Sequence, residues 1–347
     1  MPAWYPGIPY RSVELVRTRD FLWSRHLVYR LATADGRDTV LILVKQPRAA
    51  HTPYLPQDGM RDSSRGLEQQ YHALAFIHAR FGDEHFDGIA AVRPLAMLGD
   101  VDALVMQYRP GRDFNSVLTR AARPWARRET AEAAITIAAT AGRFLALLHH
   151  LRRDPHPRTE VFRWSALAGA VPELLARLAE TTSRREIRTR LRSIQHSLPP
   201  PGDRAPRTTV THLHGDYYPG NLVLLPEGRL FTVDTTFSHV GPVEVDIAKF
   251  LVGVNTLKSR LLLGHLGARV AVLSRVNEAF LKGYSSVGSY SPETLELCRL
   301  NELARRRHEA LSVLKSDCPR VIADVIWRNR IEPELTRCLL EDHDSDY

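Results

Sequence analysis

The sequence has few cysteines, and their arrangement builds no site. Cys298, Cys318 and Cys338 are the only three in 347 residues. An odd number of widely spaced cysteines excludes a disulfide framework, and no pair has the spacing of a metal site. We therefore expect free thiols in a reducing cytosol.

Long apolar runs are also missing. A membrane-spanning helix needs about 20 mostly apolar residues, and the most apolar helical stretch, 133–142, ends at Arg143. The first residues have neither the basic nor the apolar part of a secretory signal. We expect a cytoplasmic protein with no transmembrane segment.

The charge balance is mildly positive. The 47 Lys and Arg residues exceed the 39 Asp and Glu residues, which gives a formal net charge of +8. Hydrophobic residues make up 44% and charged residues 25%, so the chain has the composition of a globular protein and no disorder signature. No nucleic-acid-binding motif accompanies the positive charge, and we predict no nucleic-acid partner.

The length fits two lobes, and the two parts of the chain differ in pattern. Up to residue 108 the pattern is of short strands with one helix, 67–81. From residue 113 it is mainly helical, with a strand-and-loop region at 209–246. We predict an α+β protein with domains 1–108 and 109–347. The expected strands are 12–21, 26–32, 39–45, 92–98 and 103–108, and the expected later helices are 126–151, 166–198, 262–284 and 292–314.

The chemistry concentrates in the strand-and-loop region. Asp216, Asn221, Asp234 and Asp246 each follow a short apolar run or a turn. Phosphoryl transfer needs a carboxylate that receives the proton of the attacking hydroxyl, oxygen ligands for Mg²⁺, and positive charge on the phosphates. A lysine that ends a predicted strand, Lys45, would supply the phosphate contact.

These residues carry a family resemblance. The order His214-Gly-Asp216, then Asn221, Val233-Asp234 and Asp246-Ile-Ala resembles the catalytic segment of the aminoglycoside phosphotransferase-like family. The resemblance covers roughly residues 12–285. It implies a bilobal protein-kinase-like fold, with an antiparallel sheet and one helix in the N-lobe and a larger, mostly helical C-lobe. It also implies ATP or GTP and Mg²⁺ in the cleft between the lobes.

The resemblance implies roles residue by residue. Asp216 would be the catalytic base, with Asn221 and Asp234 as metal ligands. His214 and Asp246 would support the catalytic loop without touching substrate.

The nucleotide would be bound by the N-lobe. Lys45 would contact the α- and β-phosphates and pair with Glu68, and the backbone around Gln107 and Tyr108 would meet the adenine edge. The turn that should cover the phosphates, 21–29, has no glycine, so Ser24 would contact phosphate through its hydroxyl or amide.

The molecule that accepts the phosphoryl group is the part of the function that the sequence determines least. The resemblance implies a small molecule with a hydroxyl group, and the Arg-rich segments 184–192 and 305–307 disfavour a polycationic aminoglycoside. A sugar, a glycan intermediate or an amino alcohol is the preferred class. Three alternatives stay open: an antibiotic-modifying kinase, a catalytically silent nucleotide-binding regulator, and a protein kinase.

Overall fold

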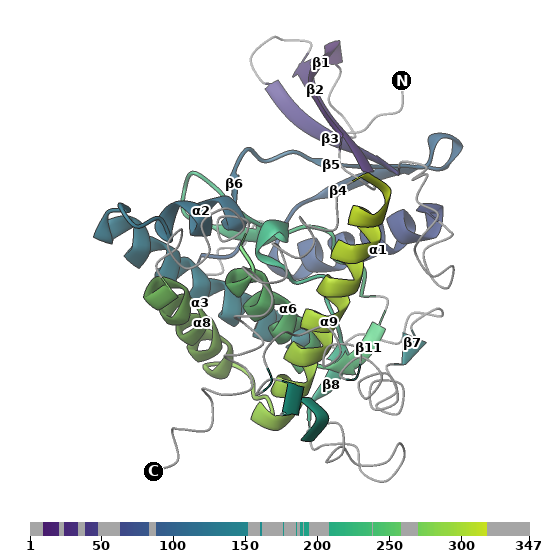
Figure 1. Cartoon of the computed structure of the whole chain (residues 1–347). Helices are drawn as coiled ribbons and strands as arrows, with labels where there is room; N and C mark the ends of the chain where they lie inside the picture. The colour runs from purple at the N-terminus through teal and green to yellow at the C-terminus, as the bar shows by residue number, and fades with distance from the viewer. Residues whose placement is uncertain are drawn as a thin grey trace. The chain divides into compact units, whose positions relative to one another are not determined.

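The computed structural model describes most of the chain in continuous stretches (Figure 1). Isolated positions between 176 and 193 are described as well. The described ranges are 10–20, 24–33, 39–47, 63–82, 88–151, 160–161, 208–237, 239–257 and 270–317.

The chain forms two compact units. Unit 1 contains residues 1–112 and 223–237, and unit 2 contains residues 113–222 and 238–347. The domains predicted at 1–108 and 109–347 remain a prediction, and the compact units differ from them because 223–237 returns to unit 1. This return is anchored by backbone pairing, in which Ala90 N–H donates to the Leu230 carbonyl at 2.8 Å.

Unit 1 is built on a five-stranded antiparallel sheet with the order β1-β2-β3-β5-β4. Side chains alternate between the two faces of a strand, and β5 shows the consequence. Leu104 and Met106 pack with Leu67 and Leu74 of the helix α1, whereas Val105 lies in the cluster on the other face. The bounds are β1 (Tyr10–Asp20), β2 (Ser24–Thr33), β3 (Thr39–Pro47), α1 (Ser63–Phe81), β4 (Pro94–Leu98), the short helix η1 (Gly99–Val101) and β5 (Ala103–Gln107).

A second, three-stranded sheet contains the returning segment. Its order is β10-β9-β6, with β6 at Arg112–Asp113, β9 at Leu222–Leu224 and β10 at Leu230–Thr232. The strand β10 ends two residues before Asp234, so this sheet brings the predicted metal ligand into unit 1.

Unit 2 is mostly helical. Asp113 caps α2 by accepting a hydrogen bond from Ser116 N–H at 2.8 Å, and Ser291 caps α9 through Thr294 N–H at 3.2 Å. The bounds are α2 (Phe114–Ala121), α3 (Arg128–His150), α6 (Glu244–Asn255), α8 (Val270–Ser285), α9 (Pro292–Asp317), the short helix η2 (Pro219–Asn221) and the small sheet β7 (Glu160–Val161), β11 (His239–Pro242) and β8 (Val210–His212).

Helices α3 and α8 lie side by side in unit 2 (Figure 1). Glycines permit the close approach: a Cβ atom at Gly142 would stand 2.0 Å from the Phe280 carbonyl oxygen, and one at Gly283 would stand 2.0 Å from that of Ala139. Within the described residues, α3 alone is long and apolar enough by composition to cross a membrane, but 50% of its apolar window is buried. Its packing on α8 identifies it as a core helix, and its bounds lie within the helix predicted at 126–151.

One prediction of local structure needs correction. The sequence favoured strand and loop as far as Asp246, whereas the helix α6 already begins at Glu244. Nearly all of α6 is buried, so its apolar residues do not follow a one-sided helical period. The helices predicted at 166–198 lie largely outside the described residues. Of the glycine-free turn predicted at 21–29, residues 21–23 lie outside the described residues, and residues 24–29 belong to the strand β2.

Candidate active site

Lys45 is a buried cation in unit 1. It lies on β3 with 7% of its surface exposed, and its ammonium group forms an ion pair with Asp234 and donates to Gln70 Oε1 at 3.0 Å. A buried charge requires such a partner, because desolvation costs several kcal/mol. The predicted phosphate-binding lysine and one predicted metal ligand are therefore brought together.

The predicted pair between Lys45 and Glu68 is not formed. The side chain of Glu68 is 59% exposed and lies 4.0 Å from His72 Nε2. On α1, residues 68 and 70 are two positions apart, which is about 200° around a helix, so they face opposite sides. Gln70 occupies the place beside Lys45 that the sequence analysis gave to Glu68, and neighbouring polar residues at 68–70 offered no signal to separate them.

Asp234 adopts an unusual backbone conformation. Its φ is +60°, and Phe237 follows with φ +48°. A residue other than glycine in this region is uncommon, although aspartate tolerates it better than most. Strain of this kind persists where the surrounding structure enforces it, and it clusters at functional sites. The side chain of Asp234 remains 35% exposed although its carboxylate pairs with Lys45.

Two residues of β2 complete this cluster. His26 is the cross-strand partner of Lys45, and its ring Nε2 lies 3.1 Å from the hydroxyl of Ser24. Burial and the charge of Lys45 lower the pKa of His26 to about 4, although the charge of Asp234 acts the other way. The ring is therefore neutral at pH 7. The sequence analysis proposed Ser24 but missed His26, whose only signal was its position two residues along the same strand.

The predicted adenine-binding segment follows β5. The Gln107 N–H donates to the Arg93 carbonyl at 2.8 Å, and the Tyr108 N–H donates to the Leu41 carbonyl at 2.9 Å. Both amides are thus used by the sheet and cannot donate to a base. Arg109 holds its side chain against Glu227 at 2.7 Å, and its amide has no partner in the described part of the chain.

Asp216 and Asn221 lie together in unit 2. The Asn221 side-chain amide donates to the Asp216 carboxylate at 2.8 Å and to the Asp216 carbonyl at 3.0 Å. The helical turn η2 creates this contact, since the Asn221 N–H also donates to the Tyr218 carbonyl at 2.8 Å. Asp216 is exposed, so a carboxylate with a fixed orientation faces solvent.

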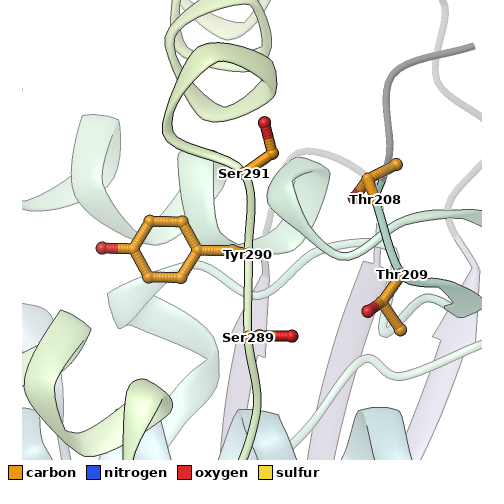
Figure 2. A pocket seen from close by; sticks show the side chains of 5 residues that line it. All are labelled: Thr208, Thr209, Ser289, Tyr290 and Ser291. Atoms are coloured by element: carbon orange, nitrogen blue, oxygen red, sulfur yellow. The ribbon is translucent and has the colours of Figure 1, made fainter.

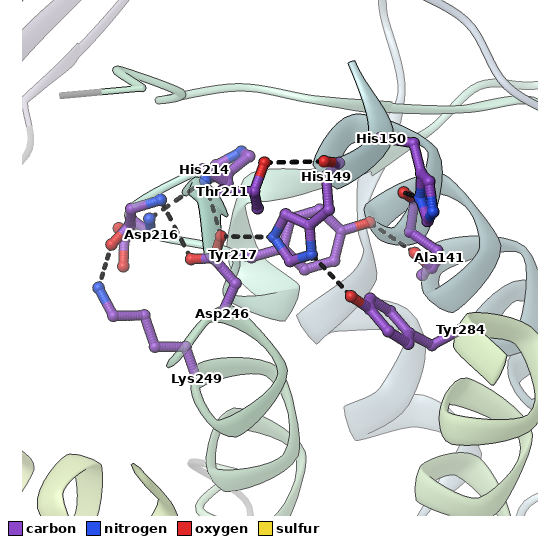
Figure 3. A network of polar contacts seen from close by, with 12 residues as sticks. Ala141, His149, His150, Thr211, His214, Asp216, Tyr217, Asp246, Lys249 and Tyr284 are labelled. Carbon is purple, nitrogen blue, oxygen red and sulfur yellow. Dashed lines mark hydrogen bonds and ion pairs between the residues drawn. The ribbon is translucent and has the colours of Figure 1, made fainter. Parts of the chain in front are cut away.

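Asp246 holds the backbone that leads to Asp216 (Figure 3). It is fully buried and accepts from the backbone N–H of His214 at 2.6 Å and of Gly215 at 3.1 Å. Asp216 N–H in turn lies 3.2 Å from the ring Nδ1 of His214. The supporting role that the resemblance implied for His214 and Asp246 stays a prediction, and these contacts are compatible with it. Gly215 has φ +90°, which only glycine adopts freely.

His149 extends this network into α3. Its Nε2–H donates to Asp246 Oδ2 at 3.1 Å, and its Nδ1 lies 2.9 Å from the hydroxyl of Tyr284 on α8 (Figure 3). Burial alone would raise the pKa of Asp246, but the hydrogen bond and charge of His149 outweigh it, so that pKa lies below its usual value. The sequence offered no partner for His149, because residues 97 positions apart show no spacing pattern.

The residues present suit Mg²⁺ only together with phosphate oxygens. Among the described residues, no group of three or more His, Cys, Asp and Glu side chains lies close enough to hold a metal ion. Mg²⁺ is typically held by one or two protein ligands and by substrate phosphates. The side-chain amide of Asn221 contains an oxygen of the type that this mode uses, and the carboxylate of Asp234 supplies such oxygens too.

A separate hydroxyl-lined hollow of about 400 Å³ lies in unit 2 (Figure 2). Thr208 and Thr209 line one side, and the ring of Tyr290 points away from them. The buried Glu244 nearby accepts from Thr208 Oγ1 and from Ser291 N–H, so both of its oxygens are used. This hollow contains none of the predicted site residues, and Glu244 serves to fix the start of α9.

The antiparallel sheet with α1, the helical unit 2 and the two polar clusters define a phosphotransferase of the kinase class. The chain matches the model of the phosphotransferase enzyme family (APH) over residues 24–285. It belongs to that family, and the predicted family, fold class and enzyme class are confirmed. It is a small-molecule phosphotransferase.

Solved structures support the fold. A glucosamine kinase matches with a TM-score of 0.55 at 15% identity, over 97% of this chain and 96% of that chain. Glucosamine kinase in complex with glucosamine, ADP and inorganic phosphate matches with a TM-score of 0.52 at 15% identity, over 93% and 94%. LicA, a choline kinase from Streptococcus pneumoniae, in complex with AMP, matches with a TM-score of 0.50 at 13% identity, over 94% of each chain. No curated protein sequence matches the chain.

Proposed function

We propose that this protein is an ATP- and Mg²⁺-dependent kinase that transfers the γ-phosphoryl group to a hydroxyl of a small molecule in the cytoplasm. A sugar, a glycan intermediate or an amino alcohol is the acceptor class. The observation that carries this proposal is the exposed Asp216 carboxylate, held by Asn221 at 2.8 Å.

The chemistry assigned to Asp216 is proton acceptance. An acceptor hydroxyl oxygen forms a bond to the γ-phosphorus, the bond from that phosphorus to the β-bridging oxygen breaks, and ADP leaves. The hydroxyl proton passes to the Asp216 carboxylate. Positioning and charge stabilisation supply most of the rate in such transfers, and the bond from Asn221 fixes the carboxylate for this purpose.

Lys45 is assigned to the nucleotide phosphates. Its ammonium group has three donors, of which two go to Asp234 and Gln70, so one remains for a phosphate oxygen. Asn221 and Asp234 would hold Mg²⁺, which would neutralise charge on the phosphates when bound. The neutral His26 adds no competing charge beside Lys45.

The test compares Asp216→Asn with the wild type in an ADP-release assay and in calorimetric titration with Mg²⁺–ATP and Mg²⁺–GTP. Loss of a general base lowers turnover by about 10²–10⁴-fold, while nucleotide affinity should persist. Asp100→Asn, at an exposed carboxylate of η1, is the matched control and should behave as wild type. Equal turnover in Asp216→Asn would reject the base assignment, and nucleotide binding without any turnover in the wild type would favour the silent nucleotide-binding regulator.

A further inference from the structure

Lys249 is a cation on α6 that contacts the catalytic loop directly. Its ammonium group donates to the Gly215 carbonyl, one residue before Asp216 (Figure 3). Among the described residues it forms an ion pair with no carboxylate, and it uses one of its three donors. Lys249 is only partly buried.

Arg306 contacts the same loop from α9. Its guanidinium carbon lies 5.0 Å from the ring centroid of Tyr218, two residues after Asp216. The side chain is 17% exposed. It donates from Nε to Glu302 at 2.8 Å and from Nη1 to the Thr256 hydroxyl at 3.1 Å. Three of its five N–H donors therefore have no hydrogen-bond acceptor among the described residues.

The carboxylate next to these cations is already neutralised. Glu302 is 3% exposed and receives a two-pronged contact from Arg305, at 2.8 Å from Nε and 2.6 Å from Nη2. Burial would raise the pKa of Glu302, but the bond from Arg305 and the charges of Arg305, Arg306 and Lys249 lower it. The other buried carboxylate near Lys249, Asp246, has its oxygens engaged by three N–H groups.

We propose that Lys249 and Arg306 form an anion subsite on both flanks of the catalytic loop, so that the acceptor carries a carboxylate or phosphate group near the hydroxyl that is phosphorylated. This inference rests on the proposed kinase function and narrows its acceptor class. Partly buried cations with unused donors bind anionic oxygens by charge-assisted hydrogen bonds. The same cations repel an ammonium group, which disfavours amino sugars and amino alcohols as acceptors.

The experiment compares an uncharged sugar with polyols that carry one carboxylate, phosphate or ammonium group. Glucose, gluconate, glucose 6-phosphate and glucosamine are tested as acceptors in the ADP-release assay and as ligands of the enzyme saturated with Mg²⁺–ADP. Gluconate and glucose 6-phosphate distinguish a carboxylate from a phosphate. Lys249→Met and Arg306→Gln are compared with the wild type, and Lys282→Met, at an exposed lysine of α8, is the matched control.

The expected result is that an anionic polyol binds more tightly than glucosamine, and that each variant weakens the anion about tenfold, as expected for the loss of one charge-assisted contact. Nucleotide affinity is measured in every variant and reports both folding and the proposed kinase function. If nucleotide binding is normal, four results would overturn the subsite. These are a preference for glucosamine, no preference among the polyols, no binding of any polyol, and an anion preference that survives both variants. Loss of nucleotide binding in the wild type would overturn the kinase function itself, and the subsite with it.

Discussion

Replacing Asp246 by asparagine tests the support of the catalytic loop. The carboxylate accepts from His214 N–H at 2.6 Å, Gly215 N–H at 3.1 Å and His149 Nε2–H at 3.1 Å, and it is fully buried. Asparagine offers one acceptor oxygen and one NH₂ group. If its oxygen takes the place shared by His214 and His149, its NH₂ faces the Gly215 N–H, and a buried donor loses its acceptor.

The magnitude follows from these contacts. A buried polar group without its partner costs about 1–3 kcal/mol, and hydrogen bonds to a charged group contribute about 1.5–3 kcal/mol. Breaking one side of a buried charged pair costs about 3–5 kcal/mol, and we expect the free energy of unfolding to fall by that amount. The melting temperature should then fall by about 6–20 °C, from about 2–4 °C per kcal/mol.

The loss should depend on pH in a defined direction. The pKa of Asp246 in the folded protein lies below its unfolded value of 3.8, so its charge stabilises the fold above that pH. The stabilisation disappears as the pH falls through the lower, folded value. Wild type and Asp246→Asn should therefore differ by a constant amount above about pH 5 and converge in more acidic solution.

Urea denaturation followed by circular dichroism measures the difference, with Asp100→Asn as the control that should stay within about 0.5 kcal/mol of the wild type. The variant should also lose turnover, because the backbone on which Asp216 stands is no longer fixed. A variant within about 1 kcal/mol of the wild type at pH 7 would refute the reasoning, since three bonds to a buried carboxylate would then contribute almost nothing.

Three further predictions concern other parts of the molecule. Because the pKa of His26 falls to about 4 from 6.5 in the folded state, stability is greatest above pH 6.5 and should decline by about 3 kcal/mol as the pH falls to 4; urea titrations of His26→Gln should lack that decline, and an unchanged profile would contradict it. Gly283→Ala should destabilise unit 2 by about 1–3 kcal/mol through overpacking, whereas Gly66→Ala, which meets no atom within 4 Å, should not lower the melting temperature. Glu68→Gln should leave ATP affinity unchanged and Gln70→Ala should weaken it in calorimetric titration; the opposite pattern would restore the pair that the sequence suggested.

The elements with a regular period were predictable from the sequence. The strands of unit 1 alternate, and α9 begins where Ser291 and Pro292 indicate a cap and a first turn. The helix α6 was not predictable in this way, because its residues are buried on nearly all sides and show no polar stripe. Periodicity therefore detected the elements with one solvent-facing side and failed for the helix at the centre of unit 2.

The contacts of the candidate site also differ in how far they could be predicted from the sequence. The contact of Asp216 with Asn221 joins residues five positions apart, and the motif of the family resemblance already placed both residues in one segment. The contact of Lys45 with Gln70 depends on the rotation of α1 against the sheet. The contact of His149 with Asp246 depends on the packing of two helices. Such contacts arise from tertiary structure, and one sequence contains no local pattern that specifies them.

The backbone conformation at the site differs from what the conformational preferences of its residues would predict. Asp234 and Phe237 have positive φ in unit 1, where local preference would select glycine or asparagine. In unit 2 the residue before Asp216 is Gly215, with φ +90° and with both its N–H and its carbonyl held by side chains of α6. A sequence under selection for stability alone would avoid a strained aspartate. Its presence at Asp234, beside a buried lysine, is therefore better explained by the direction in which the carboxylate must point than by the stability of the turn.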